Sequence, residues 1–245
     1  MKKQIDFLKN YKNKHMKNFI IIGGSSGTGE AIVENLVTAG HNIIATYNTS
    51  IKECTPSVNY VKLDVTTDEL NDNDLPEEIY GLVYCPGSIN LKPFHRFKEE
   101  DFISDFRLQV LGATKIIKQL LPRMNKAQGA SIVLFSTVAV QTGFTFHSQV
   151  AISKGAIEGL TRSLAAEFAP SIRVNAIAPA LTKTKLSERL LNTPEKIKYH
   201  ADKNPSKRIG SPQDLAEAAC YLLSDKSSWV TGQIMNVNGG FGNLA

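Results

Sequence analysis

Glycine and hydroxyl side chains follow an apolar run near the start of the chain. The segment reads Gly23-Gly24-Ser25-Ser26-Gly27-Thr28-Gly29, and a helical pattern begins near Glu30. Glycine permits positive φ and lets the backbone approach a phosphate closely, and a helix N-terminus favours negative charge. We expect this segment to bind the pyrophosphate of a dinucleotide, with a simple strand-to-helix turn as the alternative.

Short apolar runs and longer amphipathic windows alternate from Asn18 onward. Continuous apolar runs are typical of strands buried on both faces, and their alternation with helices predicts a parallel sheet with right-handed crossovers. We expect strands over residues 19–22, 43–45, 61–63, 82–84, 132–135 and 174–178, and helices over 29–39, 101–121, 150–168 and 212–223. The sequence therefore predicts an α/β fold with a doubly wound sheet.

A few residues mark where these elements begin and end. Ser211 can cap the last helix, Pro212 suits its first turn, and Pro122 is expected to close the long central helix. Residues 49–59 and 66–79 are polar and lack helical periodicity, so the crossovers there should be short. We expect one domain over residues 16–245, preceded by an extension, residues 1–15, that is an upstream start, a vector-derived remnant or a flexible arm.

The charge of the chain is concentrated at its start. The formal net charge is +5, of which +4 lies in residues 1–15, where five lysines face only Asp6. A nucleic-acid interface needs basic side chains spread over a folded face, so we expect no nucleic-acid partner. No apolar stretch is long enough to span a bilayer or to form a signal-peptide core, so we expect no membrane association and a cytoplasmic location.

The three cysteines, Cys54, Cys85 and Cys220, are few, odd in number and widely spaced. This pattern argues against a disulfide framework and against a zinc site, so we expect no metal.

Several motifs, in order along nearly the whole chain from Met16, resemble those of the short-chain dehydrogenase/reductase family, and in particular its 3-oxoacyl-acyl-carrier-protein reductase-like members. They are the glycine-rich segment, Leu63-Asp64-Val65, Gly87, Arg173 to Pro179, Thr231-Gly232-Gln233 and Val237-Asn238-Gly239-Gly240. The resemblance implies a Rossmann-type three-layer sandwich with a mostly seven-stranded parallel sheet. It also implies that a nicotinamide nucleotide is the cofactor.

The positions that match the family's cofactor site are spread over the chain. The resemblance assigns cofactor binding to Gly23, Ser25, Ser26, Thr28, Gly29, Tyr47, Asn48, Asp64, Val65, Gly87, Lys154, Pro179 and Thr184. At the end of the second strand, the sequence Thr46-Tyr47-Asn48-Thr49-Ser50 contains no acidic residue that would bind the ribose 2′-hydroxyl and repel a 2′-phosphate. We therefore favour NADP(H) over NAD(H), with Lys52 as a candidate for the phosphate's positive partner.

The catalytic positions depart from the family pattern. Family members transfer a proton through a tyrosine that is oriented by Ser, Lys and Asn, and here Val150 stands at the tyrosine position. Only Lys154 is unchanged, because Thr137 aligns with the serine and Gln109 with the asparagine. Ser136 is a weaker alternative to Thr137, and Lys154 could hold the cofactor ribose without taking part in catalysis.

Two residues could replace the missing proton donor. His147 lies three residues before Val150, and an imidazole titrates near neutrality, so it is a speculative general acid. The alternative is a histidine of the substrate loop beside Phe144 and Phe146, since the Lys154 cation would disfavour a second positive charge nearby. Ser148 is a weaker candidate.

Two functions remain open. The first is an NADP(H)-dependent oxidoreductase acting on a carbonyl/alcohol pair, with an acyl thioester as one candidate substrate. The second is a catalytically impaired nucleotide-binding subunit or sensor, in a mixed oligomer with an active relative. The resemblance implies a homo-tetramer or dimer, and Phe144, Phe146 and residues 181–191 are expected to form a pocket wall and lid over a partly apolar small molecule.

Overall fold

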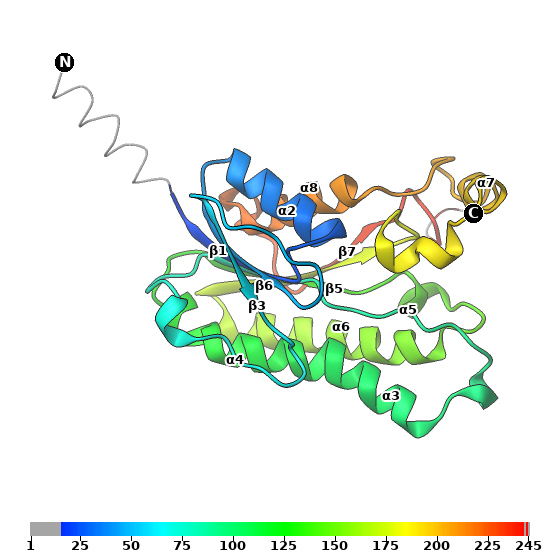
Figure 1. The fold of residues 1–245 in the computed structure, drawn as a ribbon, viewed down its shortest axis with the longest axis horizontal. Helices are drawn as coiled ribbons and strands as arrows, with labels where there is room; N and C mark the ends of the chain where they lie inside the picture. The colour runs from blue at the N-terminus through cyan, green and yellow to red at the C-terminus, as the bar shows by residue number, and fades with distance from the viewer. Residues whose placement is uncertain (1–15, 243, 245) are drawn as a thin grey trace, which may run out of the picture.

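One parallel sheet organises the chain in the computed structural model, which describes residues 16–242 and 244 (Figure 1). Its strand order is β3-β2-β1-β4-β5-β6-β7, and every neighbouring pair is parallel. The strands are β1 (Asn18–Ile22), β2 (Asn42–Tyr47), β3 (Val58–Lys62), β4 (Gly81–Tyr84), β5 (Ala130–Phe135), β6 (Ile172–Pro179) and β7 (Ile234–Val237). The predicted doubly wound α/β fold is confirmed. The expected extension over residues 1–15 lies outside the described residues.

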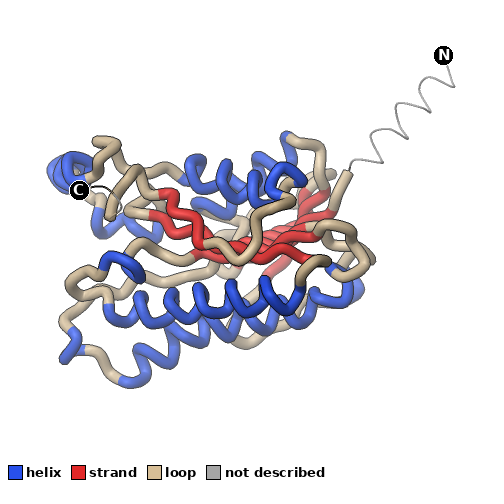
Figure 2. Tube along the Cα trace, turned by 180° about the vertical axis from the view of Figure 1, so that it is seen from behind, coloured by secondary structure: helices blue, strands red, loops and turns tan. Residues whose placement is uncertain are grey.

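Helices cover both faces of the sheet and make a three-layer sandwich (Figures 1 and 2). On one face lie α2 (Gly27–Thr38) and α8 (Pro212–Leu223), and on the other lie α3 (Glu99–Phe106), α4 (Gly112–Met124) and α6 (Ser148–Phe168). Strand β1 shows why both faces must be covered. Its buried residues alternate, with Phe19 and Ile21 packing on the α2 and α8 side and Ile20 and Ile22 on the α4 side.

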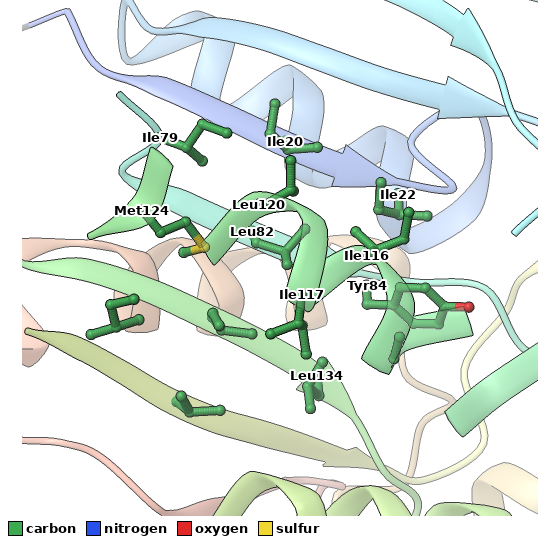
Figure 3. Packing of buried hydrophobic residues seen from close by; sticks show 14 of the residues in the cluster. Ile20, Ile22, Ile79, Leu82, Tyr84, Ile116, Ile117, Leu120, Met124 and Leu134 are labelled. Atoms are coloured by element: carbon green, nitrogen blue, oxygen red, sulfur yellow. The ribbon is translucent and has the colours of Figure 1, made fainter. Parts of the chain in front are cut away.

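The core beneath α4 is made of aliphatic side chains that interdigitate between helix and sheet (Figure 3). Ile116 and Leu120 of α4 are fully buried against Ile20 and Leu82 of the sheet. Tyr84 lies at the end of this cluster, and its hydroxyl donates a hydrogen bond to the carbonyl of Leu108, 2.6 Å away. This contact ties the end of β4 to the helix that carries Gln109.

The long central helix differs from the prediction in two ways. It contains a π-helical turn, Arg107–Leu111, between α3 and α4. The prediction that Pro122 closes it was wrong, because α4 continues through Pro122 to Met124. A proline removes one backbone hydrogen bond, and here the complete burial of Leu120 and Met124 on either side favours the helical path.

Other local predictions can be checked directly. Helix α8 begins at Pro212 as expected, and Ser211 Oγ accepts a hydrogen bond from the N–H of Asp214 at 3.2 Å. Within the segments 49–59 and 66–79, the only helix that the structure describes is the short Asp72–Asp74. Those crossovers are therefore abbreviated, as predicted. The sequence analysis missed α5 (Ala139–Thr142) and α7 (Pro194–Lys203). In the described part of the chain no helix is both long and apolar enough to cross a membrane.

Chain order reverses between β1 and β4. Strands β2 and β3 extend from one side of β1, and β4 to β7 extend from the other. At such a point the loops after the strands separate to opposite faces and leave a crevice at the carboxyl ends, where doubly wound folds bind ligands. The glycine-rich segment follows β1 and Gly87 follows β4, so both predicted site segments are at this edge.

Candidate functional site

The glycine-rich segment makes a turn that only small residues can form. Gly23 has φ of +75°, and a Cβ on Gly29 would lie 2.2 Å from the carbonyl oxygen of Gly23. The first turn of α2 therefore packs directly on the end of β1. This close packing leaves the N-terminus of α2 facing the crevice, so the backbone fits an anionic pyrophosphate.

A second segment approaches the same turn from β6. A Cβ on Gly27 would lie 3.6 Å from Thr184 Cβ, so Thr184 stands directly opposite the loop that also carries Ser25, Ser26 and Thr28. Thr184 precedes the short helix Lys185–Leu190, and its N–H donates to Ser187 Oγ at 3.1 Å. The structure thus brings Thr184 to the glycine-rich segment, as a shared cofactor site requires.

The ends of β2 and β3 lie beside this turn. Thr46 Oγ1 accepts a hydrogen bond from the N–H of Gly23 at 2.9 Å, which fixes the loop to β2. Tyr47 is partly exposed and Asn48 is exposed, and the Asn48 side chain hydrogen-bonds Asp64. Hydrogen bonds from Thr66, and more weakly from Asn48, hold the pKa of the Asp64 carboxyl below its ordinary value.

Lys52, the candidate phosphate partner, is paired with a carboxylate. Its ammonium contacts Glu30 in the first turn of α2, and hydrogen bonding to Glu30 raises the pKa of Lys52. The contact bridges the loop after β2 and the N-terminus of α2. A positive charge is therefore present near the glycine-rich segment, although a carboxylate already accompanies it.

The loop after β4 joins the nucleotide turn to Lys154. A Cβ on Gly23 would lie 3.3 Å from Pro86 Cδ, so the glycine-rich turn packs on this loop. Gly87 follows Pro86, and a Cβ on Gly87 would lie 3.4 Å from Gln109 Oε1 and 3.7 Å from Lys154 Nζ. Gln109 and Lys154 come from different helices, the π-helical turn η3 (Arg107–Leu111) and α6, and meet against Gly87. Val65 packs against the start of α4, where its Cγ2 lies 3.2 Å from the position of a Cβ on Gly112.

Burial changes the ionisation of the groups around Lys154. It lowers the pKa of Lys154 from 10.5 to about 8, an effect that the negative charge of Asp105 opposes. Burial also raises the pKa of the neighbouring Cys85 thiol to about 12. Near neutral pH, Cys85 is therefore a neutral thiol, while Lys154 is protonated and can release its proton more readily than an ordinary lysine.

Thr137 and Ser136 are adjacent but differ in environment. Ser136 is 3% exposed, and its hydroxyl donates to the buried Glu158 at 2.8 Å. Thr137 is only partly buried, and its Oγ1 accepts a long hydrogen bond, 3.3 Å, from the N–H of Ala139. The carbonyl of Pro179 accepts from the N–H of Val138 at 3.2 Å and so holds this loop against β6. Of the two hydroxyls, that of Thr137 is more available to a ligand.

Val150 and His147 occupy the start of α6. Val150 is 7% exposed and offers no polar atom. His147 precedes the helix, its Nδ1 lies 2.8 Å from the carbonyl oxygen of Thr145, and its ring packs on Phe144 with centroids 5.4 Å apart. Ser148 Oγ is buried without a hydrogen-bond partner among the described residues. The structure thus gives His147 contacts in the loop that contains Phe144.

Two polar residues of the site were missed by sequence reasoning. Asp105 is 4% exposed, and its two carboxylate oxygens each accept from Gln109 Nε2 at 2.8 Å. Ser88 Oγ donates to the same carboxylate. Asp105 precedes Gln109 by four residues, and this helical spacing was the available signal. A buried carboxylate beside a candidate catalytic amide could have been suspected from it.

Known proteins resemble the chain over nearly its whole length. Residues 23–242 match the family model described as "Enoyl-(Acyl carrier protein) reductase". An L-xylulose reductase of Bos taurus is 32% identical over 91% of this chain and 95% of its own, and a 3-oxoacyl-[acyl-carrier-protein] reductase FabG of Thermotoga maritima is 31% identical over 90% and 96%. The ligand-free aldohexose dehydrogenase of Thermoplasma acidophilum is 27% identical over 96% and 97%, with a TM-score of 0.84. The chain belongs to the short-chain dehydrogenase/reductase family.

Proposed function

We propose that the protein is an NADP(H)-dependent oxidoreductase that interconverts a carbonyl group and an alcohol on a small, partly apolar substrate. The observation that carries this proposal is the pair Lys154 Nζ and Gln109 Oε1 against Gly87, one residue from the contact between Pro86 and the glycine-rich turn. A nucleotide held by that turn would extend past Pro86 toward Lys154. The relatives named as reductases favour an enzyme over the impaired subunit or sensor.

The cofactor, when bound, supplies or accepts the hydride. The residues of the chain then have three tasks: to hold the nucleotide, to orient the substrate oxygen, and to provide its proton. Gly23, Gly29 and Thr184 would hold the pyrophosphate, and Thr137 Oγ1 would donate a hydrogen bond to the substrate oxygen. The Lys154 ammonium stabilises negative charge that develops on that oxygen as the carbonyl is reduced.

Lys154 is also our candidate for the proton donor, because Val150 cannot transfer a proton. During reduction the carbonyl carbon gains the hydride, the C=O double bond becomes single, and the oxygen takes a proton from Lys154 Nζ. Solvent then returns the proton to the neutral amine. A pKa of about 8 suits this exchange near neutral pH. His147 is the second candidate, since it lies one turn before Val150 at the start of α6.

The preference for NADP(H) rests on the end of β2. Tyr47 and Asn48 are uncharged and stand where an acidic residue would repel a 2′-phosphate. Lys52, in the loop after β2, forms an ion pair with Glu30 and provides a positive charge near this place. Lys52→Ala should weaken NADPH binding by about fivefold and leave NADH binding nearly unchanged, since the substitution removes one exposed, solvent-screened phosphate contact. Lys62→Ala, at the end of β3, is the matched control. Equal losses for both nucleotides would contradict the proposed role of Lys52.

The substrate proposal rests on the aromatic residues near α6. Phe144 packs against Phe241 with ring centroids 5.7 Å apart, and Phe146 is 50% exposed. The Thermotoga maritima relative is named as a reductase of a 3-oxoacyl group on acyl carrier protein. An acyl thioester, our candidate substrate, has an apolar chain that could pack on this aromatic wall and a carbonyl that Lys154 could contact.

We also propose that the protein works in the cytoplasm as a homo-tetramer or dimer. All three cysteines are free thiols, as expected in a reducing compartment. Ile103 and Leu111 near η3 and Ile152 on α6 are each about half exposed, which suits an apolar contact between subunits.

The decisive test compares the parent protein with Val150→Tyr, using NADPH and an acetoacetyl thioester, with Lys154→Met as the negative control. General acids contribute about 10²- to 10⁴-fold in rate, so a slow parent and a large gain in the variant are expected if the phenol reaches the substrate oxygen. Loss of all NADPH oxidation in Lys154→Met is expected as well. Absence of substrate-dependent oxidation in both the parent and Val150→Tyr would refute the proposed function.

A further inference from the structure

A buried carboxylate stands behind the Gln109 amide. Asp105 is 4% exposed and Gln109 is 1% exposed. Gln109 Nε2 donates hydrogen bonds of 2.8 Å to both carboxylate oxygens of Asp105. Ser88 donates a further hydrogen bond to Asp105. Asp105 lies in the last turn of α3 and Gln109 in the π-helical turn that follows, so the carboxylate and the amide are on one helical stretch, four residues apart.

The chemistry of these groups fixes the orientation of the amide. An ionised carboxylate can only accept hydrogen bonds, so the Gln109 NH2 group must face Asp105 and its oxygen must face the other way. That oxygen, Oε1, is buried without a hydrogen-bond partner among the described residues. It lies on the Gly87 side, where Oε1 and the Lys154 ammonium nitrogen are 3.4 Å and 3.7 Å from the same point, the position of a Cβ on Gly87. A buried acceptor costs free energy when it is unpaired, so its orientation toward a cation indicates a role in the site.

Lys154 needs such support because burial disfavours its charged ammonium and lowers its pKa. The ionisable groups that act on it are Asp105 from α3 and Cys85 from the loop after β4. The Cys85 thiol is neutral near physiological pH, since its pKa is raised to about 12. Asp105 is therefore the negative charge that opposes the loss of the proton from Lys154.

We propose that Asp105 is a positioning residue, which holds the Gln109 oxygen toward Lys154 and, with its own charge, keeps Lys154 protonated in the partly buried site. The Ser88 hydroxyl donates to the same carboxylate and helps to hold it in place. The proposal adds a residue to the site of the proposed function, and it rests on that function only in taking Lys154 as the catalytic cation. Its test needs no turnover.

The test is the pKa of Lys154 in Asp105→Asn, measured by NMR on reductively 13C-methylated protein, with the Lys154 signal assigned by its absence in Lys154→Arg. Asparagine keeps the shape but removes the charge, so the pKa of Lys154 should fall by about one pH unit or more. Asp105→Glu, which restores the charge, should recover most of the shift. A pH-dependent loss of NADPH affinity, beginning at lower pH in Asp105→Asn, is expected in parallel if the charged lysine contributes to binding.

Glu158→Gln is the matched control. Glu158 is equally buried and lies one turn beyond Lys154 on α6, but it pairs with Ser136 and Arg162. Its removal should leave the pKa of Lys154 unchanged. A second measurement covers the case in which Asp105→Asn does not fold: in the parent, the Gln109 side-chain NH2 protons should exchange slowly with solvent.

The outcomes separate the two proposals. An unchanged pKa of Lys154 in folded Asp105→Asn, the same shift in Glu158→Gln, or rapid exchange of the Gln109 amide would each overturn the role of Asp105. The shift could still be found in a protein that reduces no carbonyl. That result would refute the proposed function and leave the positioning role intact.

Discussion

Lys154 should make the stability of this protein depend on pH in a particular direction. Its pKa falls from 10.5 in the unfolded chain to about 8 in the folded protein. Each pH unit corresponds to about 1.4 kcal/mol, so a fully buried lysine would cost about 3 kcal/mol. Lys154 is only partly buried, and solvent screening reduces the expected penalty to about 1 to 3 kcal/mol.

The direction follows from proton binding. Between pH 8 and 10.5 the unfolded chain still holds the Lys154 proton while the folded protein has released it. The free energy of unfolding therefore rises with pH in this window, and the penalty is fully present below pH 8. Lys154→Met removes the titration but keeps a long apolar side chain. The variant should be the more stable protein at pH 7, and its advantage should shrink by about 1 to 3 kcal/mol toward pH 10.5.

Urea unfolding at pH 7, 8, 9 and 10 measures this difference, because the other titrating groups are common to both proteins and cancel. Lys118→Met, at an exposed position of α4, is the control and should give a difference that does not vary over the same range. If the free energies of unfolding of the parent and Lys154→Met change with pH in parallel, the argument that burial lowers the pKa of Lys154 is refuted.

Three further substitutions test the rest of the site and the fold. Gly29→Ala should lose nucleotide binding by more than tenfold, because its Cβ would meet the carbonyl oxygen of Gly23 at 2.2 Å; fluorescence titration with NADPH measures it. Tyr47→Asp should reverse the cofactor preference toward NADH, which the ratio of the two dissociation constants reports. Ser211→Ala should lower the free energy of unfolding by about 1 kcal/mol, measured in urea, because it removes the cap of α8.

Each of these changes has a control or a contrary result. Gly159→Ala adds the same methyl group where it meets nothing within 4 Å, so it should bind NADPH like the parent. Unchanged binding in Gly29→Ala would mean that the turn after β1 does not hold the nucleotide. Tighter binding of NADPH than NADH by Tyr47→Asp would contradict the account of β2. An unchanged midpoint in Ser211→Ala would show that water replaces the cap without loss.

The positions of most elements could be predicted because local and global signals agree. Strands β1 and β4 are mostly continuous apolar runs, and α8 begins at a serine, a proline and an acid in their expected order. Pro122 misled because its local preference was outweighed by burial of Leu120 and Met124, which depends on the sheet beneath α4. Local propensity is weak beside tertiary packing where the two conflict.

The residues of the candidate site also fall into those that could be predicted from the sequence and those that could not. Spacing alone identified the glycine-rich segment, because positive φ and close backbone contacts restrict the residue type, and the resemblance to the family supplied Thr184 and Lys154. The contact between Gly27 and Thr184 joins segments far apart in the chain and could be expected only through that resemblance. The pairing of Lys52 with Glu30 was not foreseen, because it depends on how the loop after β2 lies on α2.

By itself the sequence determined the fold class and the glycine-rich turn after β1, since both follow from residue types and their spacing, and the resemblance to the family added the prediction that Val150 stands at the position of the proton donor. Only the tertiary structure decided what surrounds Lys154. The lowered pKa, the meeting of Lys154 and Gln109 at Gly87, and the carboxylate of Asp105 behind them arise from burial and from contacts between α3, α6 and the loop after β4. Desolvation and charge depend on distances in space, and the sequence specifies these only once the chain has folded.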